Sequence, residues 1–259
     1  MALFTDAGVI TLDDLLPFES SLVQVASSHG IDVDTKINLS IGAIGDKLML
    51  WLLNSRASDP QWLNRRLLGL STVVVTAPLH RWLCFDSLSR FFAEAYNVQL
   101  NTRFQAKWAE YQQQASVAAG ICFMSDIGIV YNALPKPFIP RISLGAGTLP
   151  AQAVFIQTAW IDTHQNESAL SPPNGVILDA DSSLSVTITD APLLAPAAAA
   201  GWNVYAGSTE AGVTRQNTAP LAIGVTWPLP NSGLVNGPSA INGQQPNYYL
   251  ILSRQIQRG

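Results

Sequence analysis

The chain has 259 residues, 48% of them hydrophobic, which is enough to build the cores of two ordinary domains. Only 12% of the residues are charged, and the formal net charge of −4 argues against the basic surface that binds free nucleic acid. Arg215 is the only Lys or Arg residue between positions 150 and 253. Such low charge suits a β-rich module or a surface that neighbouring chains cover.

The sequence predicts neither a secretory leader nor a membrane anchor. Residues 1–21 contain no basic leader, and no segment reaches the roughly 18 consecutive apolar residues that span a bilayer. We therefore expect a soluble protein that is made in the cytoplasm. Cys84 and Cys122 lie within helical patterns, and we expect both to be buried free thiols.

The apolar spacing is helical from residue 1 to about residue 132. The first predicted helix covers residues 34–55, with apolar residues at alternating steps of four and three and with Asp34 or Thr35 as its cap. The second covers residues 59–70, where Pro60 suits a first turn and Gly69 lies near the end.

Two longer helices follow. Residues 77–96 have a broad apolar face, which predicts a heavily buried helix. The next helix starts at residues 100–114 with Asn101 as its cap. Its predicted buried stripe is Phe104, Trp108, Tyr111 and Ala115, and its predicted solvent side is Arg103, Lys107, Glu110 and Gln114.

The pattern changes after residue 134. Residues 135–150 contain four prolines, which predicts a linker. Beyond it, short β-branched and aromatic runs are separated by turn-rich pieces, at residues 153–162, 183–189, 201–208, 221–229 and 247–253. These runs predict an α+β multidomain chain: a helical bundle of about four helices over residues 1–134, and an immunoglobulin-like antiparallel β-sandwich with a C-terminal tail over residues 151–259.

No catalytic, cofactor or metal site stands out. His29, His80 and His164 are scattered and have no second ligand at metal spacing. Asp32 and Asp34 alternate as in a calcium loop, but the following residues do not fit, and acidic residues at a helix N-terminus explain them better. We therefore expect no cofactor and no enzyme activity, and a lytic activity would need a carboxylate pair in a cleft.

Residues 30–120 carry a family resemblance. The segments "VVVTAPLHRW" and "NTRFQAKWAEY" are its most specific parts, and they resemble the head-to-tail connector, or adaptor, proteins of tailed bacteriophages. The second half resembles the immunoglobulin-like or fibronectin-type modules of phage structural proteins. It departs from them at His164, Gln165 and Asn166, where such modules more usually have a glycine.

The resemblance implies a structural virion protein at the head-to-tail junction, made in the host cytoplasm. It would form a homo-oligomeric, dodecameric ring beneath the portal protein, contact tail proteins, and line a channel through which the genomic DNA passes. The candidate residues for the contact with the next subunit or the portal are Arg65, Arg66, Arg103, Lys107, Glu110, Gln114, Arg254 and Arg258.

A second function class stays open. Aromatic faces bind sugars, so the sandwich could hold a host-surface glycan and the protein could be a decoration protein. The candidate aromatic residues are Trp202, Tyr205, Trp227, Tyr248 and Tyr249. The same residue types are more often found in the core of a sandwich, where we place Trp160 and Trp202.

Overall fold

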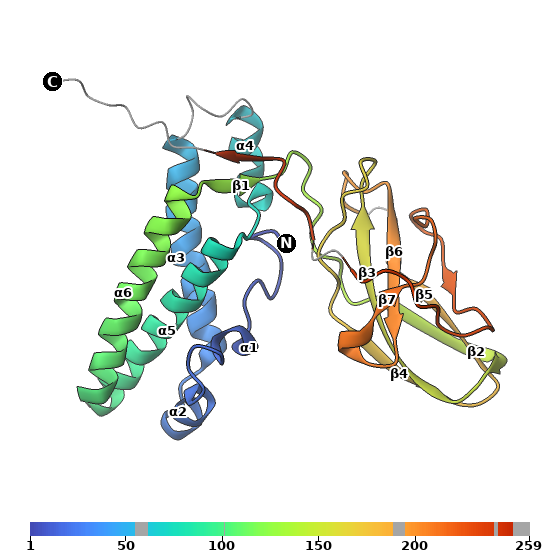
Figure 1. Ribbon diagram of the computed structural model, residues 1–259, viewed down its shortest axis with the longest axis horizontal. Helices are drawn as coiled ribbons and strands as arrows, with labels where there is room; N and C mark the ends of the chain where they lie inside the picture. The colour runs from blue at the N-terminus through green and yellow to red at the C-terminus, as the bar shows by residue number, and fades with distance from the viewer. Residues whose placement is uncertain (55–61, 101, 189–194, 241–242, 251–259) are drawn as a thin grey trace. The chain divides into compact units, whose positions relative to one another are not determined.

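The structure is a computed structural model, and it describes residues 1–54, 62–100, 102–188, 195–240 and 243–250 (Figure 1). The chain folds into two compact units. The helical unit consists of Ala7–Ile129 and the segment that starts at Pro246, and the β unit consists of Met1–Asp6 and Val130–Gln245. The chain therefore passes from one unit to the other three times.

The helical unit contains the four predicted helices and two short ones before them. Its elements are α1 (Leu12–Leu15), α2 (Leu22–His29), α3 (Val33–Asn54), α4 (Trp62–Leu68), a 3-10 turn η1 (Gly69–Thr72), α5 (Ala77–Gln99) and α6 (Thr102–Met124). The Asp32 carboxylate accepts a hydrogen bond from the backbone N–H of Asp34, so α3 is capped two residues earlier than the sequence predicts. The predicted cap of α6, Asn101, lies outside the described residues.

The three long helices alternate in direction, as the ribbon in Figure 1 shows. At one end, Lys36 of α3 forms an ion pair with Glu94 of α5, and Tyr96 of α5 stacks on Trp108 of α6. At the other end, Phe123 of α6 lies 5.5 Å from the ring of Trp82 on α5 and 5.9 Å from the ring of Trp51 on α3. Both α3 and α6 are therefore antiparallel to α5 and parallel to each other.

The helix α5 lies at the centre of this unit. Its apolar side chains are buried almost all round, including Leu79, Trp82, Leu88, Phe91 and Phe92. Cys84 on α5 and Cys122 on α6 are buried free thiols, as predicted, and burial raises the pKa of each to about 12.

A small antiparallel sheet closes the helical unit. Strand β1 (Ile127–Ile129) pairs with β9 (Tyr248–Leu250), and Val73 forms a bridge to Ile129. A Cβ atom at Gly128 would lie 2.7 Å from the Pro246 ring, so only glycine fits where the two segments cross. The prediction that residues 247–253 end the sandwich is therefore wrong for β9, because alternation shows a strand but does not show its partner.

The β unit is a sandwich of two antiparallel sheets. Its strands are β2 (Arg141–Leu149), β3 (Gln152–Ile161), β4 (Asn174–Leu178), β5 (Ser182–Thr187), β6 (Gly201–Gly207), β7 (Thr214–Arg215) and β8 (Trp227–Pro228). One sheet has the order β2-β5-β8 and the other the order β4-β3-β6-β7. Inward-facing residues of both sheets, such as Val154, Val186, Trp202 and Trp227, form one core. The predicted α+β architecture, helices first and antiparallel sheets second, is confirmed.

Part of the predicted linker is a strand. Residues 135–150 include β2, which pairs with β5 from Arg141↔Thr187 to Ala146↔Ser182 and then shifts register at a bulge. A Cβ atom at Gly147 would lie 2.4 Å from the Ser182 carbonyl oxygen, so the bulge requires glycine there. Prolines before the strand and glycines within it are typical of a linker, so composition alone did not indicate a strand here.

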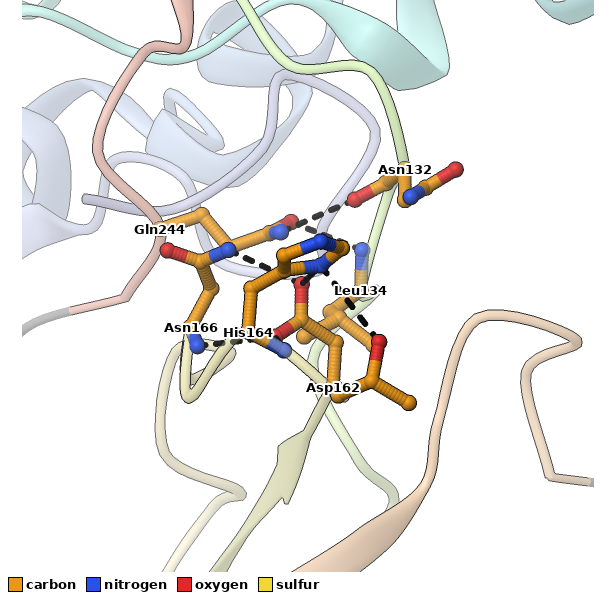
Figure 2. A network of polar contacts seen from close by, with 7 residues as sticks. Asn132, Leu134, Asp162, His164, Asn166 and Gln244 are labelled. Carbon is orange, nitrogen blue, oxygen red and sulfur yellow. Dashed lines mark hydrogen bonds and ion pairs between the residues drawn. The ribbon is translucent and has the colours of Figure 1, made fainter.

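Two buried polar side chains hold the segments that enter and leave the β unit. The amide of Gln244 donates to the Asn132 carbonyl oxygen at 2.8 Å and accepts from the Leu134 N–H at 2.7 Å (Figure 2). The Asp6 carboxylate accepts from the backbone N–H groups of Leu3 and Lys136. Burial raises the pKa of Asp6 despite these two hydrogen bonds, which lower it.

Candidate interaction surface

One face of α6 carries residues at alternating steps of four and three along almost its whole length. We call this row the α6 stripe, and its members are Arg103, Lys107, Glu110, Gln114, Val117, Ile121 and Met124. Its first four residues are the α6 positions that the sequence predicts for protein contact, so the structure brings these four together on one face. Its last three are apolar and exposed: Val117 by 56%, Ile121 by 41% and Met124 by 68%.

A groove of about 430 Å³ runs beside the apolar half of this stripe. It lies between α5, α6 and the end of the α1 region, and its lining residues are Phe18, Arg81, Phe85, Gln113, Gln114, Val117, Ala118 and Ile121. The rings of Phe18 and Phe85 meet edge to face at 4.9 Å and form an aromatic wall. Among the described residues that line the groove, Arg81 is the only charged one, so the groove offers mostly apolar surface with one cation.

A second, smaller hollow of about 190 Å³ lies at the other end of α6. Its lining residues are Ser21, Gln24, Val25, Ser28, His29, Phe92, Arg103, Phe104 and Lys107. Among these residues, the His29 ring meets the Phe104 ring edge to face at 5.5 Å. The stripe therefore changes character along the helix, from polar and basic at its start to apolar at its end.

The sequence predicts that Lys107 lies on the solvent side of its helix, but in the structure its side chain turns to the interior of the unit. Its ammonium forms an ion pair with the buried carboxylate of Glu19 and lies 5.3 Å from the centre of the Phe92 ring. The Tyr111 hydroxyl also donates to Glu19, at 3.3 Å, and to the Phe18 carbonyl oxygen, at 3.0 Å. Lys107 is therefore occupied within its own chain, because a long side chain next to the buried face can reach an internal carboxylate.

The buried side of α6 is mostly as predicted. Phe104, Tyr111 and Ala115 are buried. Trp108 is only half-buried, and its ring stacks on Tyr96 at 6.1 Å. The predicted interface residue Glu110 is exposed and accepts a hydrogen bond from the Gln114 amide at 3.0 Å, so these two stabilise the helix itself.

The remaining predicted interface residues lie elsewhere. Arg65 and Arg66 lie in α4, and their side chains are outside what the structure describes. Arg254 and Arg258 lie outside the described residues. Arg90 on α5 forms an ion pair with Asp86, one turn away on the same helix.

Two of the histidines lie beside carboxylates of their own chain. The His80 Nε2 atom lies 3.4 Å from a carboxylate oxygen of Asp14, and the exposed His164 ring lies 4.0 Å from that of Asp162. Across the described residues, no three His, Cys, Asp or Glu side chains are grouped so as to hold a metal ion. A search of the same residues for a helix long and apolar enough to cross a membrane finds none.

The aromatic residues proposed for glycan binding are not available on the sandwich. Trp202, Tyr205 and Trp227 are buried, with at most 6% of each side chain exposed. Tyr205 donates from its hydroxyl to the buried carboxylate of Glu167, and burial together with this hydrogen bond raises the pKa of Tyr205. Tyr248 and Tyr249 lie on β9, in the helical unit. The glycan alternative therefore loses the residues that suggested it.

The sequence reading missed the apolar half of the α6 stripe and the groove beside it. The signal for the stripe was present, because the steps of four and three continue from Gln114 to Met124. The groove had no such signal, since Phe18 and Arg81 reach it from distant positions in the chain. Comparison of the sequence with protein-family models gives no match, and comparison with curated proteins gives no significant match.

Proposed function

We propose that this protein is a structural assembly protein of a tailed-bacteriophage virion, a head-to-tail adaptor. Its helical unit joins a ring of identical copies beneath the portal, the ring lines the channel for the genomic DNA, and the opposite side of the ring meets the tail. The mild negative charge of the chain suits a channel that does not hold its DNA, because attraction to phosphate needs clustered Lys and Arg.

The α6 stripe and its groove are the observation that supports this function. Three neighbouring large apolar side chains are exposed on one helix face, beside a groove of about 430 Å³ with an aromatic wall. Contiguous exposed apolar surface on a packed unit marks a contact with another protein. Buried aromatic and apolar anchors with a polar rim are the usual composition of such contacts.

The test is the mass of the complex that forms when the full chain is mixed with the portal protein encoded alongside it. We expect saturation at a copy number that matches the symmetry of the portal ring. Ile121→Asp should weaken this association, since it places a charge in the apolar half of the α6 stripe. Gln112→Asp, on an exposed side of α6 away from the stripe, is the matched control. Absence of any complex with the wild-type chain would exclude the adaptor function.

A further inference from the structure

The β unit has one long strand at the edge of a sheet. Strand β2 pairs with β5 on one side, and within the part of the chain that the structure describes no strand pairs with its other side (Figure 1). Residues 143–148 of this strand are all exposed. An edge strand presents a row of N–H and C=O groups that can pair with a further strand, so the direction of these groups decides what β2 can bind.

The direction of the β5 backbone follows from its other neighbour, β8. The Leu229 N–H donates to the Leu184 carbonyl oxygen at 2.8 Å, on the β8 side of β5. Successive residues of a strand direct their backbone groups alternately to the two sides. The N–H and C=O groups of Ser183 and Ser185 therefore point to β2. In agreement, Ser185 lies opposite Pro228, which has no N–H to exchange.

The same alternation fixes which groups of β2 point outward. Ser143 lies opposite Ser185, so its backbone groups point to β5. The backbone groups of Ile142, Leu144 and Ala146 therefore point away from β5. Strand β2 thus offers three N–H donors and three C=O acceptors along its free edge.

These three residues are evenly spaced about Leu144, so the free edge is its own complement in an antiparallel pair. When Leu144 lies opposite Leu144 of a second copy, Ile142 lies opposite Ala146 of that copy. Each such pair exchanges two hydrogen bonds, and all the outward groups of both strands find a partner. A register shifted by two residues sets Ala146 opposite Pro140, which has no N–H, and is therefore less favourable.

The side chains of β2 suit the same register. Ile142 packs against the core of the sandwich, whereas Leu144, on the same face, is 54% exposed. Across the axis the two Leu144 side chains meet and cover this apolar surface. Arg141, the one charged residue of β2, lies opposite Gly147, so no like charges face each other. Edge strands that avoid pairing usually carry Lys or Pro, and residues 142–146 contain neither.

We propose that two copies of the free protein pair through β2 and form a two-fold dimer. The two three-stranded sheets join into one, in the order β8-β5-β2-β2-β5-β8, with Leu144 on the axis. The contact closes after two copies, because both copies present the same strand. It goes beyond the adaptor function, and it lies on the β unit, whereas the α6 stripe lies on the helical unit.

The mass of the full chain in solution, measured by sedimentation over a range of concentrations, tests the dimer. Leu144→Lys should raise the dissociation constant at least about tenfold, because two like charges would meet at the axis. Leu144→Glu should do the same, and an equimolar mixture of the two variants should dimerise again, because opposite charges then meet. Thr148→Lys, exposed on the same strand but outside the paired residues, is the matched control.

Two proline variants test the direction of the backbone groups. Leu144→Pro removes an N–H that only the second copy uses, so it should abolish the dimer and leave the melting temperature of the monomer unchanged. Ser143→Pro removes an N–H that bonds to β5, so it should lower the melting temperature of the β unit.

Disulfide cross-linking tests the register. In the dimer, two copies of Leu144→Cys have Cα atoms about 5.5 Å apart, within the range of a disulfide. Two copies of Thr148→Cys lie eight residues out of register, roughly 27 Å apart along the strands, and should give no cross-link. The wild-type chain, whose two cysteines are buried, should give none either.

The outcomes decide the β2 contact on its own. A wild-type dimer that Leu144→Lys dissociates, and that mixing with Leu144→Glu restores, supports the contact. A wild-type chain that stays monomeric at about 1 mM overturns it, and leaves this edge to water or to a different chain. A dimer that Leu144→Lys leaves unchanged overturns it as well. The adaptor function is measured separately, by the complex with the portal protein.

Discussion

The carboxylate of Glu19 is held inside the helical unit by a donor two residues along the chain and by two donors from α6. Ser21, Lys107 and Tyr111 all donate to it. Burial raises the pKa of Glu19, but the hydrogen bonds from Lys107 and Ser21 outweigh burial and the pKa is lowered from 4.5. Glu19 therefore stabilises the fold fully above the unfolded-state pKa, and this contribution is lost as the pH falls through the lower folded-state pKa.

Lys107→Met is the residue-scale test. At pH 7 it should lower the free energy of unfolding of the helical unit by roughly 1–3 kcal/mol, because it leaves a buried carboxylate without its cation. The loss should shrink as the pH falls below 4.5, where Glu19 takes up a proton. Denaturant unfolding at pH 7 and in acid measures both. Glu19→Gln should flatten the same acid dependence, and an unchanged dependence in that variant would show that Glu19 is not its source.

At the scale of the element, α6 takes part in two tryptophan contacts that differ in how far the tryptophan is buried. Trp82 of α5 is 1% exposed and packs against Phe123 of α6, whereas Trp108 of α6 is half-buried on Tyr96. The sequence predicts that Trp108 belongs to the buried stripe of α6, and truncation of a fully buried ring costs about 3–5 kcal/mol. In the structure, the fully buried tryptophan of these two is Trp82.

Alanine at each of these two positions separates the contributions. Trp82→Ala should lower the free energy of unfolding by about 3–5 kcal/mol, since it opens a cavity in the core. Trp108→Ala should cost about 1–3 kcal/mol, because it removes half-buried area and one stacked pair. Chemical denaturation followed by circular dichroism of the helices gives both values. Equal losses at the two positions would contradict the difference in burial.

The turn after β3 depends on one buried acceptor. The Asp162 carboxylate accepts from the backbone N–H groups of His164 and Asn166 and from the Asn166 side chain (Figure 2). Gln165, within this turn, has a φ of 65°, a left-handed conformation that favours glycine. The hydrogen bonds to Asp162 therefore hold Gln165 in this conformation without a glycine.

Asp162→Ala should destabilise the β unit by roughly 1–3 kcal/mol, since it leaves two backbone donors without their acceptor. Gln165→Gly is the matched control in the same turn, and it should change the stability by at most about 1 kcal/mol, because glycine adopts this φ without strain. Thermal unfolding followed by tryptophan fluorescence measures both. A larger loss of stability for Gln165→Gly than for Asp162→Ala would show that the turn does not depend mainly on Asp162.

At the scale of the whole molecule, each unit contains one end of the described chain. Met1–Asp6 belongs to the β unit, and β9 belongs to the helical unit. Strand β9 pairs with all three residues of β1, and Leu250 is buried there. The two units therefore depend on segments that are distant in sequence from the rest of each unit.

Two truncations test this arrangement. A chain that ends at Gln245 loses β9 and should increase hydrogen exchange at β1, because Ile127 and Ile129 lose their partner strand. A chain that starts at Ala7 loses Asp6 and should increase exchange near Lys136 in the β unit. Exchange of the other unit should stay unchanged in each case. Increased exchange spread equally over both units would contradict the division.

The sequence determined the elements that depend on local pattern. Steps of four and three fixed α3, α5 and α6, and the buried positions Phe104 and Tyr111 followed from the same spacing. Alternation located β3, β5 and β6, and the buried thiols followed from their helical context. The first four residues of the α6 stripe could likewise be named, because they share one face of one helix.

Tertiary structure alone decided which segments meet. Strand β2 was hidden by glycines that its bulge requires, and β9 pairs with β1, more than a hundred residues before it in the chain. Lys107 reaches Glu19, and Phe18 and Arg81 join the groove, through contacts between residues far apart in sequence. Periodicity reports which side of an element is apolar, whereas the partner of that side depends on packing over the whole chain.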